Sequence, residues 1–263
     1  MDRIVIDKNS ASKLTFDRDC YILIEDEVQS KDLELNILGC KVTIIDMSKS
    51  KIENINVKDS ELTLVNIGNK SDNSEVILNN DNSVVEYNVI DLDDSDKQCQ
   101  IYGKVLSEGS NTVINIATVC YKNKNKKYVI NTSNFKKNTT NEVNCFGIVK
   151  DKSVLDYDVT SFIEKGAKQA VVRQNSNILL FDKNSLGKNN PVLLIEENDV
   201  KASHGSSIGK IDDDTMFYLC SRGLSKIEAT NLICLGKVEY LMNKINDEKI
   251  KELVVNNFKE RMG

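Results

Sequence analysis

The sequence predicts a mainly β protein, a solenoid of short stacked strands followed by a small C-terminal α-helical domain. Short runs rich in β-branched residues recur up to about residue 200, and the first of them start roughly 20 residues apart. Beyond residue 210 the apolar residues change to helical spacing. The chain has one proline in 263 residues, which suits long strand ladders because proline lacks the backbone N–H that a ladder needs.

The strands are expected where apolar runs are separated by Asn, Asp, Ser, Gly and Lys, which favour turns. The stronger runs lie at residues 4–6, 21–24, 42–45, 62–65, 84–87, 112–116, 128–130 and 178–180. Weaker runs lie between the first of these, at 33–37, 52–57 and 76–78. Alternation such as Leu33-Glu34-Leu35-Asn36-Ile37 turns one face of a strand to the core and the other to solvent.

Two folds account for this strand pattern. A fixed period near 20 residues, with two or more short strands in each unit, indicates a solenoid whose rungs stack on one another. A β-sandwich with irregularly spaced turns is the alternative that the pattern alone leaves open.

Three helices are expected in the C-terminal tail. Asp212, Asp213 and Asp214 can cap and favourably charge a short helix that runs through Cys220, and Gly223 fits the left-handed stop that follows. Ser225-Lys-Ile-Glu228 is a capping-box pattern that opens a second helix. Its apolar stripe is expected to comprise Ile227, Asn231, Leu232, Leu235, Val238 and Leu241. A last helix is expected to start at Asn246-Asp247 and to present Ile250, Leu253, Val254 and Phe258 on one face.

Composition argues against two classes of partner. The formal charge of −5 and the pI near 5.2 leave no basic excess for binding nucleic acid non-specifically, so no nucleic-acid partner is expected. The Lys-rich stretch at 121–127 is interpreted as a solvated loop. The N-terminus is too polar for a signal peptide, and no apolar run approaches the roughly 18 residues needed to cross a bilayer. A cytoplasmic protein without a membrane partner is therefore expected.

The seven cysteines do not announce a metal site. They are widely spread and form no C-x-x-C pair, whereas a zinc site needs ligands clustered at short spacing. Reduced thiols packed as small apolar groups are expected, with Cys120 and Cys145 in strands and Cys220 and Cys234 on apolar helix faces. Spacing leaves open whether any of them serves as a ligand at a subunit interface.

The most specific motif lies at residues 201–224, KASHGSSIGKIDDDTMFYLCSRGL, where strands give way to helices. Residues 202–207 around the only histidine, His204, resemble the run (C/E)-x-H-(G/E)-x-(T/S). Residues 217–224, FYLCSRGL, resemble F-Y-L-x-S-R-G-(I/L). Both patterns are typical of the SufB/SufD components of the SUF iron–sulfur cluster assembly system. Segments 166–180 and 198–201 continue the resemblance, which spans roughly residues 142 to 245.

The resemblance identifies the chain as a reduced, SufD-like core member. It implies a right-handed parallel β-helix over residues 1–208 and a helical domain over 209–263 that docks on a SufC-type ATPase. It also implies a dimer through the β-helix, with a SufB-like paralogue or with a second copy. The residues that the matching motif assigns to ATPase docking are Asp213, Phe217, Tyr218, Arg222, Gly223 and Leu224. The N-terminal helical domain usual in the family is expected to be absent, because β-like sequence begins at residue 4.

The ligand set departs from the pattern of the family. SufB-like members carry a cysteine on the rung corresponding to Gln174-Asn175-Ser176, and its position is taken by Asn175. The two positions flanking the histidine hold Ser203 and Gly205, and Ala202 replaces the cysteine common in SufD. His204 is thus the one candidate metal or cluster ligand. A single imidazole cannot hold an iron–sulfur cluster, so a cluster would be bound transiently, at a subunit interface, and not permanently.

These observations predict a non-enzymatic, SufD-like subunit of the cluster assembly scaffold, with no catalytic residues. The chain has no P-loop pattern and so does not itself bind ATP in that manner. One alternative is a homodimeric minimal SufBD scaffold that builds the cluster itself. A more remote one is a β-helix polysaccharide lyase or hydrolase, which needs clustered acids. The acidic run at 91–96 is interpreted instead as a solvated turn. The sequence does not determine whether a flavin binds or which client protein receives a cluster.

Overall fold

The computed structural model of the chain describes residues 2–25, 28, 32–67 and 73–262, which form 17 strands and three helices. The strands are β1 (Asp2–Ile6), β2 (Lys13–Phe16), β3 (Cys20–Ile24), β4 (Asp32–Leu38), β5 (Lys41–Asp46), β6 (Lys51–Lys58), β7 (Glu61–Asn66), β8 (Asn73–Asp81), β9 (Val84–Asp91), β10 (Lys97–Val105), β11 (Asn111–Cys120), β12 (Asn125–Asn134), β13 (Thr140–Val149), β14 (Val154–Ile163), β15 (Val171–Leu180), β16 (Leu186–Ile195) and β17 (Lys201–Gly209).

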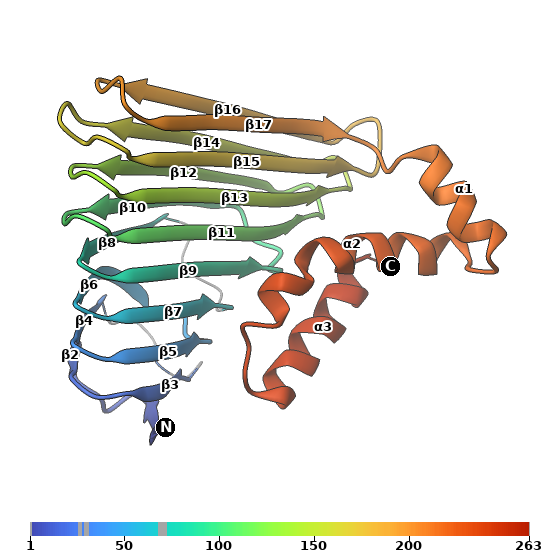
Figure 1. Cartoon of the computed structure of the whole chain (residues 1–263). Helices are drawn as coiled ribbons and strands as arrows, with labels where there is room; N and C mark the ends of the chain where they lie inside the picture. The colour runs from blue at the N-terminus through green and yellow to red at the C-terminus, as the bar shows by residue number, and fades with distance from the viewer. Residues whose placement is uncertain (1, 26–27, 29–31, 68–72, 263) are drawn as a thin grey trace.

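The strands alternate between two parallel sheets. The odd-numbered strands form one sheet in chain order, called the odd sheet below, and the even-numbered strands form the even sheet. Successive turns of the chain therefore stack as rungs, and Figure 1 shows the two sheets rising side by side from the N-terminus. Every strand pairing in the described part of the chain is parallel, so the β-helix prediction is confirmed and the β-sandwich alternative is wrong.

The rungs lengthen along the chain, which corrects the expectation of a fixed period. Lys41 pairs with Glu61, a separation of 20 residues, whereas Thr140 pairs with Val171, a separation of 31 residues. The strands themselves grow from four to six residues at the start to ten residues beyond β11. The early period was read correctly, but it does not extend to the later rungs.

One corner of each rung is made in the same way. At the turn from an even strand to the next odd strand, one residue adopts a left-handed backbone in six successive rungs: Gly39, Asp59, Asn82, Gly109, Asn138 and Gln169. Gly, Asn and Asp tolerate this conformation best, as their frequency between the runs indicated. Small residues after three of these positions link neighbouring rungs, since the backbone N–H of Cys40 donates to Ser60 Oγ and that of Ser60 to Ser83 Oγ.

The strands of the two sheets are buried differently. In β12 and β14 of the even sheet, buried and half-buried residues alternate, because one face meets the lumen of the β-helix and the other faces outward. In the odd sheet, the last five residues of β5 and of β9 are all buried. This part of the odd sheet is covered on both faces, and it coincides with the strong apolar runs of the sequence.

The second face of the odd sheet is covered by the C-terminal helices, which are α1 (Asp213–Ser221), α2 (Lys226–Met242) and α3 (Glu248–Met262). Figure 1 shows α2 and α3 beside the carboxyl ends of the odd strands, while α1 stands away from the β-helix. A hydrophobic cluster joins outward-facing residues of the odd strands, such as Leu23, Ile45 and Ile148, to Val238 of α2 and Phe258 of α3. A separate cluster fills the lumen.

The helix boundaries agree with the capping signals of the sequence. The Asp212 side chain accepts from the backbone N–H of Thr215 at 2.8 Å, and Gly223 has a φ of 99°. Ser225 and Glu228 form the expected capping box. The described helices do not reach the combination of length and apolarity that a transmembrane helix requires.

The predicted apolar stripe of α2 is only partly correct. Val238 and Leu241 are buried, but Ile227 and Leu232 are exposed, and Ala229 and Cys234 are buried in their place. In α3, Ile250, Val254 and Phe258 face the core as predicted, whereas Leu253 is exposed. The strip of α2 that meets the odd sheet is therefore rotated relative to the most hydrophobic strip of its sequence.

Gly147 tests how tightly the lumen is packed. A Cβ at this position would overlap Leu155 Cδ2 and would lie 3.3 Å from Tyr157 Cε2, and both side chains are fully buried. We expect Gly147→Ala to lower the free energy of unfolding by about 1–3 kcal/mol in urea titrations. Gly209→Ala is the matched control, because no atom lies within 4 Å of its Cβ position. Equal stability of the two variants would contradict the packing of this rung.

Candidate functional site

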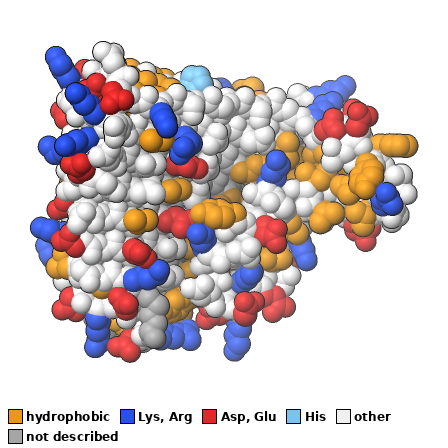
Figure 2. Space-filling model, in the orientation of Figure 1, with side chains coloured by type: hydrophobic (Ala, Val, Ile, Leu, Met, Phe, Trp, Pro, Cys, Tyr) orange, Lys and Arg blue, Asp and Glu red, His pale blue; other side chains and the backbone are white. Residues whose placement is uncertain are grey.

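His204 lies on β17, the last strand of the odd sheet. It pairs in register with Gln174 of β15, in a column of residues that faces the lumen in the rungs below. Gln174 is buried, and its Nε2 donates across the lumen to Ser161 Oγ at 2.8 Å. No further rung covers β17 in the described residues, so the imidazole of His204 is exposed, and it is visible as the pale blue side chain in Figure 2.

The other positions of the motif do not form a ligand set with His204. Asn175, which takes the position of the SufB-like cysteine, is one residue past Gln174 and therefore lies on the outer face of the odd sheet, facing away from the lumen. Gly205 continues the column of Asn175 and is also on the outer face. No group of three or more His, Cys, Asp or Glu side chains able to hold a metal occurs among the described residues.

The cysteine thiols are poorly placed to bind iron. All seven are free; six are buried, and Cys220 is partly buried. Burial raises the pKa of Cys120 to about 11 and the pKa values of Cys145 and Cys234 to about 12. Because a thiolate is the form that binds a metal, these three are inert in the folded chain, as expected for buried thiols.

The residues predicted to dock an ATPase gather on and just after α1. Phe217 is 74% exposed and Tyr218 is 55% exposed, although both are large apolar side chains. The guanidinium of Arg222 lies 5.2 Å from the centroid of the Tyr218 ring. None of the residues of α1 is buried, and Figure 2 shows hydrophobic side chains concentrated over this projecting part. Asp213 begins the helix, while Gly223 and half-buried Leu224 end the turn after it.

A groove lies between the outer face of the odd sheet and α2, with a volume of about 400 Å³. Its floor includes Asn144, Asn175 and Gly205, and its α2 wall includes Lys237 and Tyr240. Tyr240 and Lys244 also hold α2 in place, since the Tyr240 hydroxyl donates to Glu86 Oε1 at 2.5 Å and Lys244 Nζ lies 2.8 Å from Glu86 Oε2.

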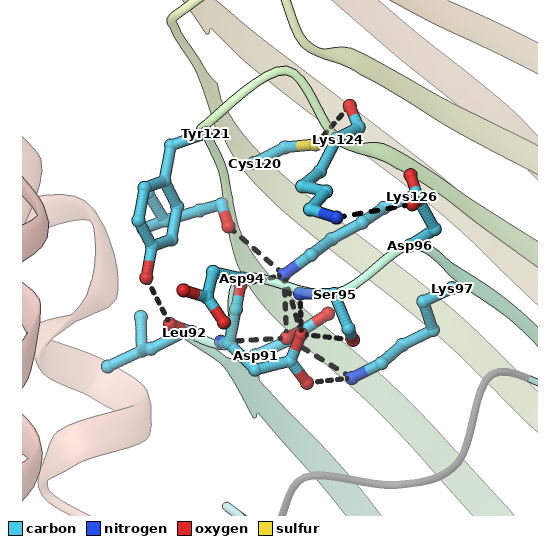
Figure 3. Close-up of polar contacts among 12 residues, drawn as sticks. Asp91, Leu92, Asp94, Ser95, Asp96, Lys97, Cys120, Tyr121, Lys124 and Lys126 are labelled. Atoms are coloured by element: carbon cyan, nitrogen blue, oxygen red, sulfur yellow. Dashed lines mark hydrogen bonds and ion pairs between the residues drawn. The ribbon is translucent and has the colours of Figure 1, made fainter.

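The acidic run at 91–96 is not simply a solvated turn, which corrects the interpretation from sequence. Asp91 is 3% exposed and Lys126 is 1% exposed, and Lys126 Nζ lies 2.8 Å from Asp91 Oδ1. Lys97 Nζ lies 3.2 Å from Asp91 Oδ1 and 2.7 Å from Asp93 Oδ2, and Tyr128 donates its hydroxyl proton to Asp91 (Figure 3). Asp94 and Asp96 do face solvent, where they pair with Lys122 and Lys124.

The buried network is balanced in charge, with two carboxylates against two ammonium groups. Burial disfavours the ionised form of Asp91, but the Lys126 and Lys97 ammonium groups outweigh burial and hold the pKa of this carboxyl below its usual range. The Lys-rich stretch was likewise misread as fully solvated. Alternation did contain the signal, because Lys126 lies two residues before inward-facing Tyr128 on β12.

Paired carboxylates that serve as acid and base in sugar hydrolysis need freedom to exchange protons and access to substrate. Asp91 and Asp93 have neither, because lysine side chains occupy their oxygens inside the β-helix. The network is therefore structural, and it gives no support to the polysaccharide-cleaving alternative.

Comparisons with known proteins agree with the motif. A family model described as "SUF system FeS cluster assembly, SufBD core domain" matches residues 4–237. The chain is 36% identical over 109 residues to the iron–sulfur cluster assembly protein SufD of Bacillus subtilis (strain 168), which covers 41% of this chain and 25% of that protein. It is 31% identical over 115 residues to SufD of Escherichia coli (strain K12), covering 44% of this chain and 27% of that protein.

A SufBD family protein of Pyrococcus horikoshii is 34% identical over 112 residues, or 41% of this chain and 25% of that protein. The aligned part of the chain thus spans about a quarter of the length of each of these relatives.

The buried network makes a sharp prediction for stability. Lys126→Met keeps the length of the side chain but leaves Asp91 without its nearest ammonium group, so we expect the free energy of unfolding at pH 7 to fall by about 3–5 kcal/mol. The pKa of Asp91 is depressed in the folded state, so the stabilisation from the pair is present at neutral pH and is lost as Asp91 becomes protonated. The difference between the two proteins should therefore shrink below about pH 4.

Urea titrations at several pH values measure both effects. Lys124→Met is the matched control, because the Lys124–Asp96 pair lies at the surface and its loss should change stability little. If Lys126→Met were as stable as this control at pH 7, the network would not support the fold.

Proposed function

Because the chain belongs to the SufBD family of the SUF iron–sulfur cluster assembly system, we propose that it is a non-enzymatic, SufD-like subunit of the cluster assembly scaffold. It pairs through its β-helix, residues 1–208, with a SufB-like subunit or with a second copy of itself. It binds a SufC-type ATPase through the C-terminal helices in residues 209–263. The iron–sulfur cluster is a transient cargo, held at the interface between subunits.

The observation that carries this proposal is the position of His204 on an unpaired strand edge. β17 and β16 end the odd and even sheets, so each presents a row of free backbone groups to an incoming strand. Apolar side chains are exposed on these two strands, among them Val192, Leu194 and Ile208, with Leu194 at 50%. A partner that adds to this edge covers the apolar side chains and brings its own ligands next to the imidazole.

The chemistry of the edge favours pairing over solvent exposure. Long exposed strand edges with apolar side chains promote association unless charges or prolines protect them. Pro191 lies in β16, where an edge strand tolerates the missing N–H. A partner is therefore the natural cover for the open end of the β-helix.

The ATPase-docking part of the proposal rests on α1. Exposed aromatic residues with an adjacent arginine are the side chains that most often dominate binding energy at protein interfaces. Phe217, Tyr218 and Arg222 form such a group, and none of them is needed to cover the odd sheet, which α2 and α3 cover.

The thiols favour the SufD-like role over a homodimeric scaffold that builds the cluster alone. Such a scaffold needs several accessible thiolates, because iron–sulfur clusters are held mainly by cysteine. Six of the seven cysteines of the chain are buried. His204 would therefore act together with ligands that a partner contributes.

The docking proposal predicts that the double substitution Phe217→Ser and Tyr218→Ser weakens binding of the SufC-type ATPase by at least about tenfold. The melting temperature should stay unchanged, because both side chains are largely exposed. Binding is measured by surface plasmon resonance with the purified ATPase. Leu253→Ser is the control, since Leu253 is an exposed apolar residue of α3 outside this group.

These substitutions are cleaner than deletion of residues 212–263, which would also uncover the outer face of the odd sheet. Undiminished ATPase binding by the double variant would overturn the docking assignment.

The ligand proposal predicts that His204→Ala impairs delivery of clusters without unfolding the protein. Because the imidazole is exposed, its removal should leave the thermal unfolding curve unchanged. The readout is the activity per polypeptide of an iron–sulfur enzyme matured in cells that carry the substitution. Ser203→Ala, the neighbouring residue on the opposite face of β17, is the control. Normal maturation with His204→Ala would count against a ligand role.

A further inference from the structure

A ladder of asparagine side chains climbs the outer face of the odd sheet. Asn115 Nδ2 donates to Asn88 Oδ1 at 2.9 Å, Asn144 Nδ2 to Asn115 Oδ1 at 3.0 Å, and Asn175 Nδ2 to Asn144 Oδ1 at 3.0 Å. These residues pair in register on β9, β11, β13 and β15. Each amide thus uses one N–H to reach the rung below and offers its oxygen to the rung above.

Two of these asparagines make a second hydrogen bond to a carboxylate. Asn144 Nδ2 donates to Glu142 Oε1 at 3.0 Å, and Asn115 Nδ2 lies 3.4 Å from Glu86 Oε1. Glu86 and Glu142 lie two residues before Asn88 and Asn144, so they share the outer face with the ladder. Carboxylate and amide, two residues apart on one strand, form the repeated unit of this surface.

The ladder stops at Asn175 with its hydrogen-bonding capacity unfilled. The position two residues before it holds Arg173 instead of a glutamate, and the next position in its column is Gly205. Among the described residues, no group donates to Asn175 Oδ1, and its Nδ2 makes one bond where Asn144 makes two. A Cβ at Gly205 would meet nothing closer than Asn175 Oδ1, at 3.5 Å, so there is room for a side chain above the ladder.

The surroundings select the charge of what would fill this space. Arg173 Nη1 lies 3.8 Å from Glu142 Oε2, and its side chain is 51% exposed, so the guanidinium can accept a second carboxylate. The space opens into the groove of about 400 Å³ against α2, where Lys237 adds a positive charge and Tyr240 an aromatic face. Within the described residues Lys237 makes no ion pair.

We propose that this groove binds a ligand that carries an amide and a carboxylate, the two groups that the lower rungs supply from their own side chains. The amide bonds to Asn175 and fills the space above Gly205, while the carboxylate pairs with Arg173. An extended peptide with Glu and Asn two residues apart presents both groups on one face at the spacing of the ladder. We therefore assign the site to an acidic, asparagine-bearing segment in extended conformation. This site is separate from the cluster and the ATPase and goes beyond the proposed function.

The probe for this site is the peptide N-acetyl-Glu-Val-Asn-amide, titrated into the full-length chain and followed by isothermal titration calorimetry and by amide chemical shifts. We expect shifts at Asn175, Gly205 and Lys237, with a dissociation constant in the millimolar range or tighter. N-acetyl-Lys-Val-Asn-amide reverses the charge that faces Arg173 and should bind at least about tenfold more weakly. N-acetylglutamine, which carries both groups on a small molecule, distinguishes a metabolite from a peptide as the source of the chemistry.

The variant that tests the geometry is Gly205→Asn, which adds one more amide to the ladder and so occupies the proposed site. It should keep or raise the melting temperature and lose at least about tenfold in affinity for the peptide. Asn175→Ala removes the last amide and should lose affinity to a similar degree, which guards against a folding defect in either variant. Lys150→Ala, at the end of β13 outside the groove, is the control and should bind as the wild type does.

Three results would overturn the proposal. These are the absence of binding by both the peptide and N-acetylglutamine, equal binding of the lysine and glutamate peptides, and full affinity in Gly205→Asn. Binding of N-acetylglutamine as tight as that of the peptide would keep the site but assign it to a small molecule.

Discussion

The packing of α2 and α3 on the outer face of the odd sheet is the interaction on which the rest of the structure depends. The cluster that joins these helices to residues such as Ile45, Val65 and Ile148 gives the lower rungs a second hydrophobic layer outside the lumen. Short rungs enclose little apolar surface, so the second layer supplies burial where the β-helix alone supplies least. It also leaves α1 without a partner within the described chain, because α2 and α3 already cover the sheet.

The buried ion network lies at the turn from β9 to β10, where the rungs begin to lengthen. Asp91 and Asp93 hold the two lysines there, and Arg261 of α3 donates to the carbonyl of neighbouring Leu92 at 3.3 Å. Tyr121 also reaches this carbonyl, and the Arg261 guanidinium lies 5.6 Å from its ring. The change in rung length, the buried charges and the end of α3 therefore meet at one place. A wider rung can enclose a polar network that a 20-residue rung has no space to pair.

The last rung carries the features that relate to partners. His204 faces the lumen side and Asn175 with Gly205 faces outward, so a single pair of strands, β15 and β17, presents an imidazole on one face and an unfinished amide ladder on the other. Both are open for the same reason, because no further rung follows β17 in the described residues. A stack of repeats satisfies each rung with its neighbours, and only its ends retain unused bonding capacity.

The sequence by itself determined the classes of structure: stacked strands, left-handed corners, three capped helices and the family motif. These features depend on neighbours within a few residues, and the strands expected at 33–37, 62–65 and 112–116 lie within β4, β7 and β11. Only the tertiary structure decided which charges are buried, which face of α2 meets the sheet and how far the period holds. Lys126 and Asp91 are 35 residues apart and become partners only because two turns of different rungs stack. Pairing across rungs depends on register and rung length, and no local pattern of residues specifies these quantities.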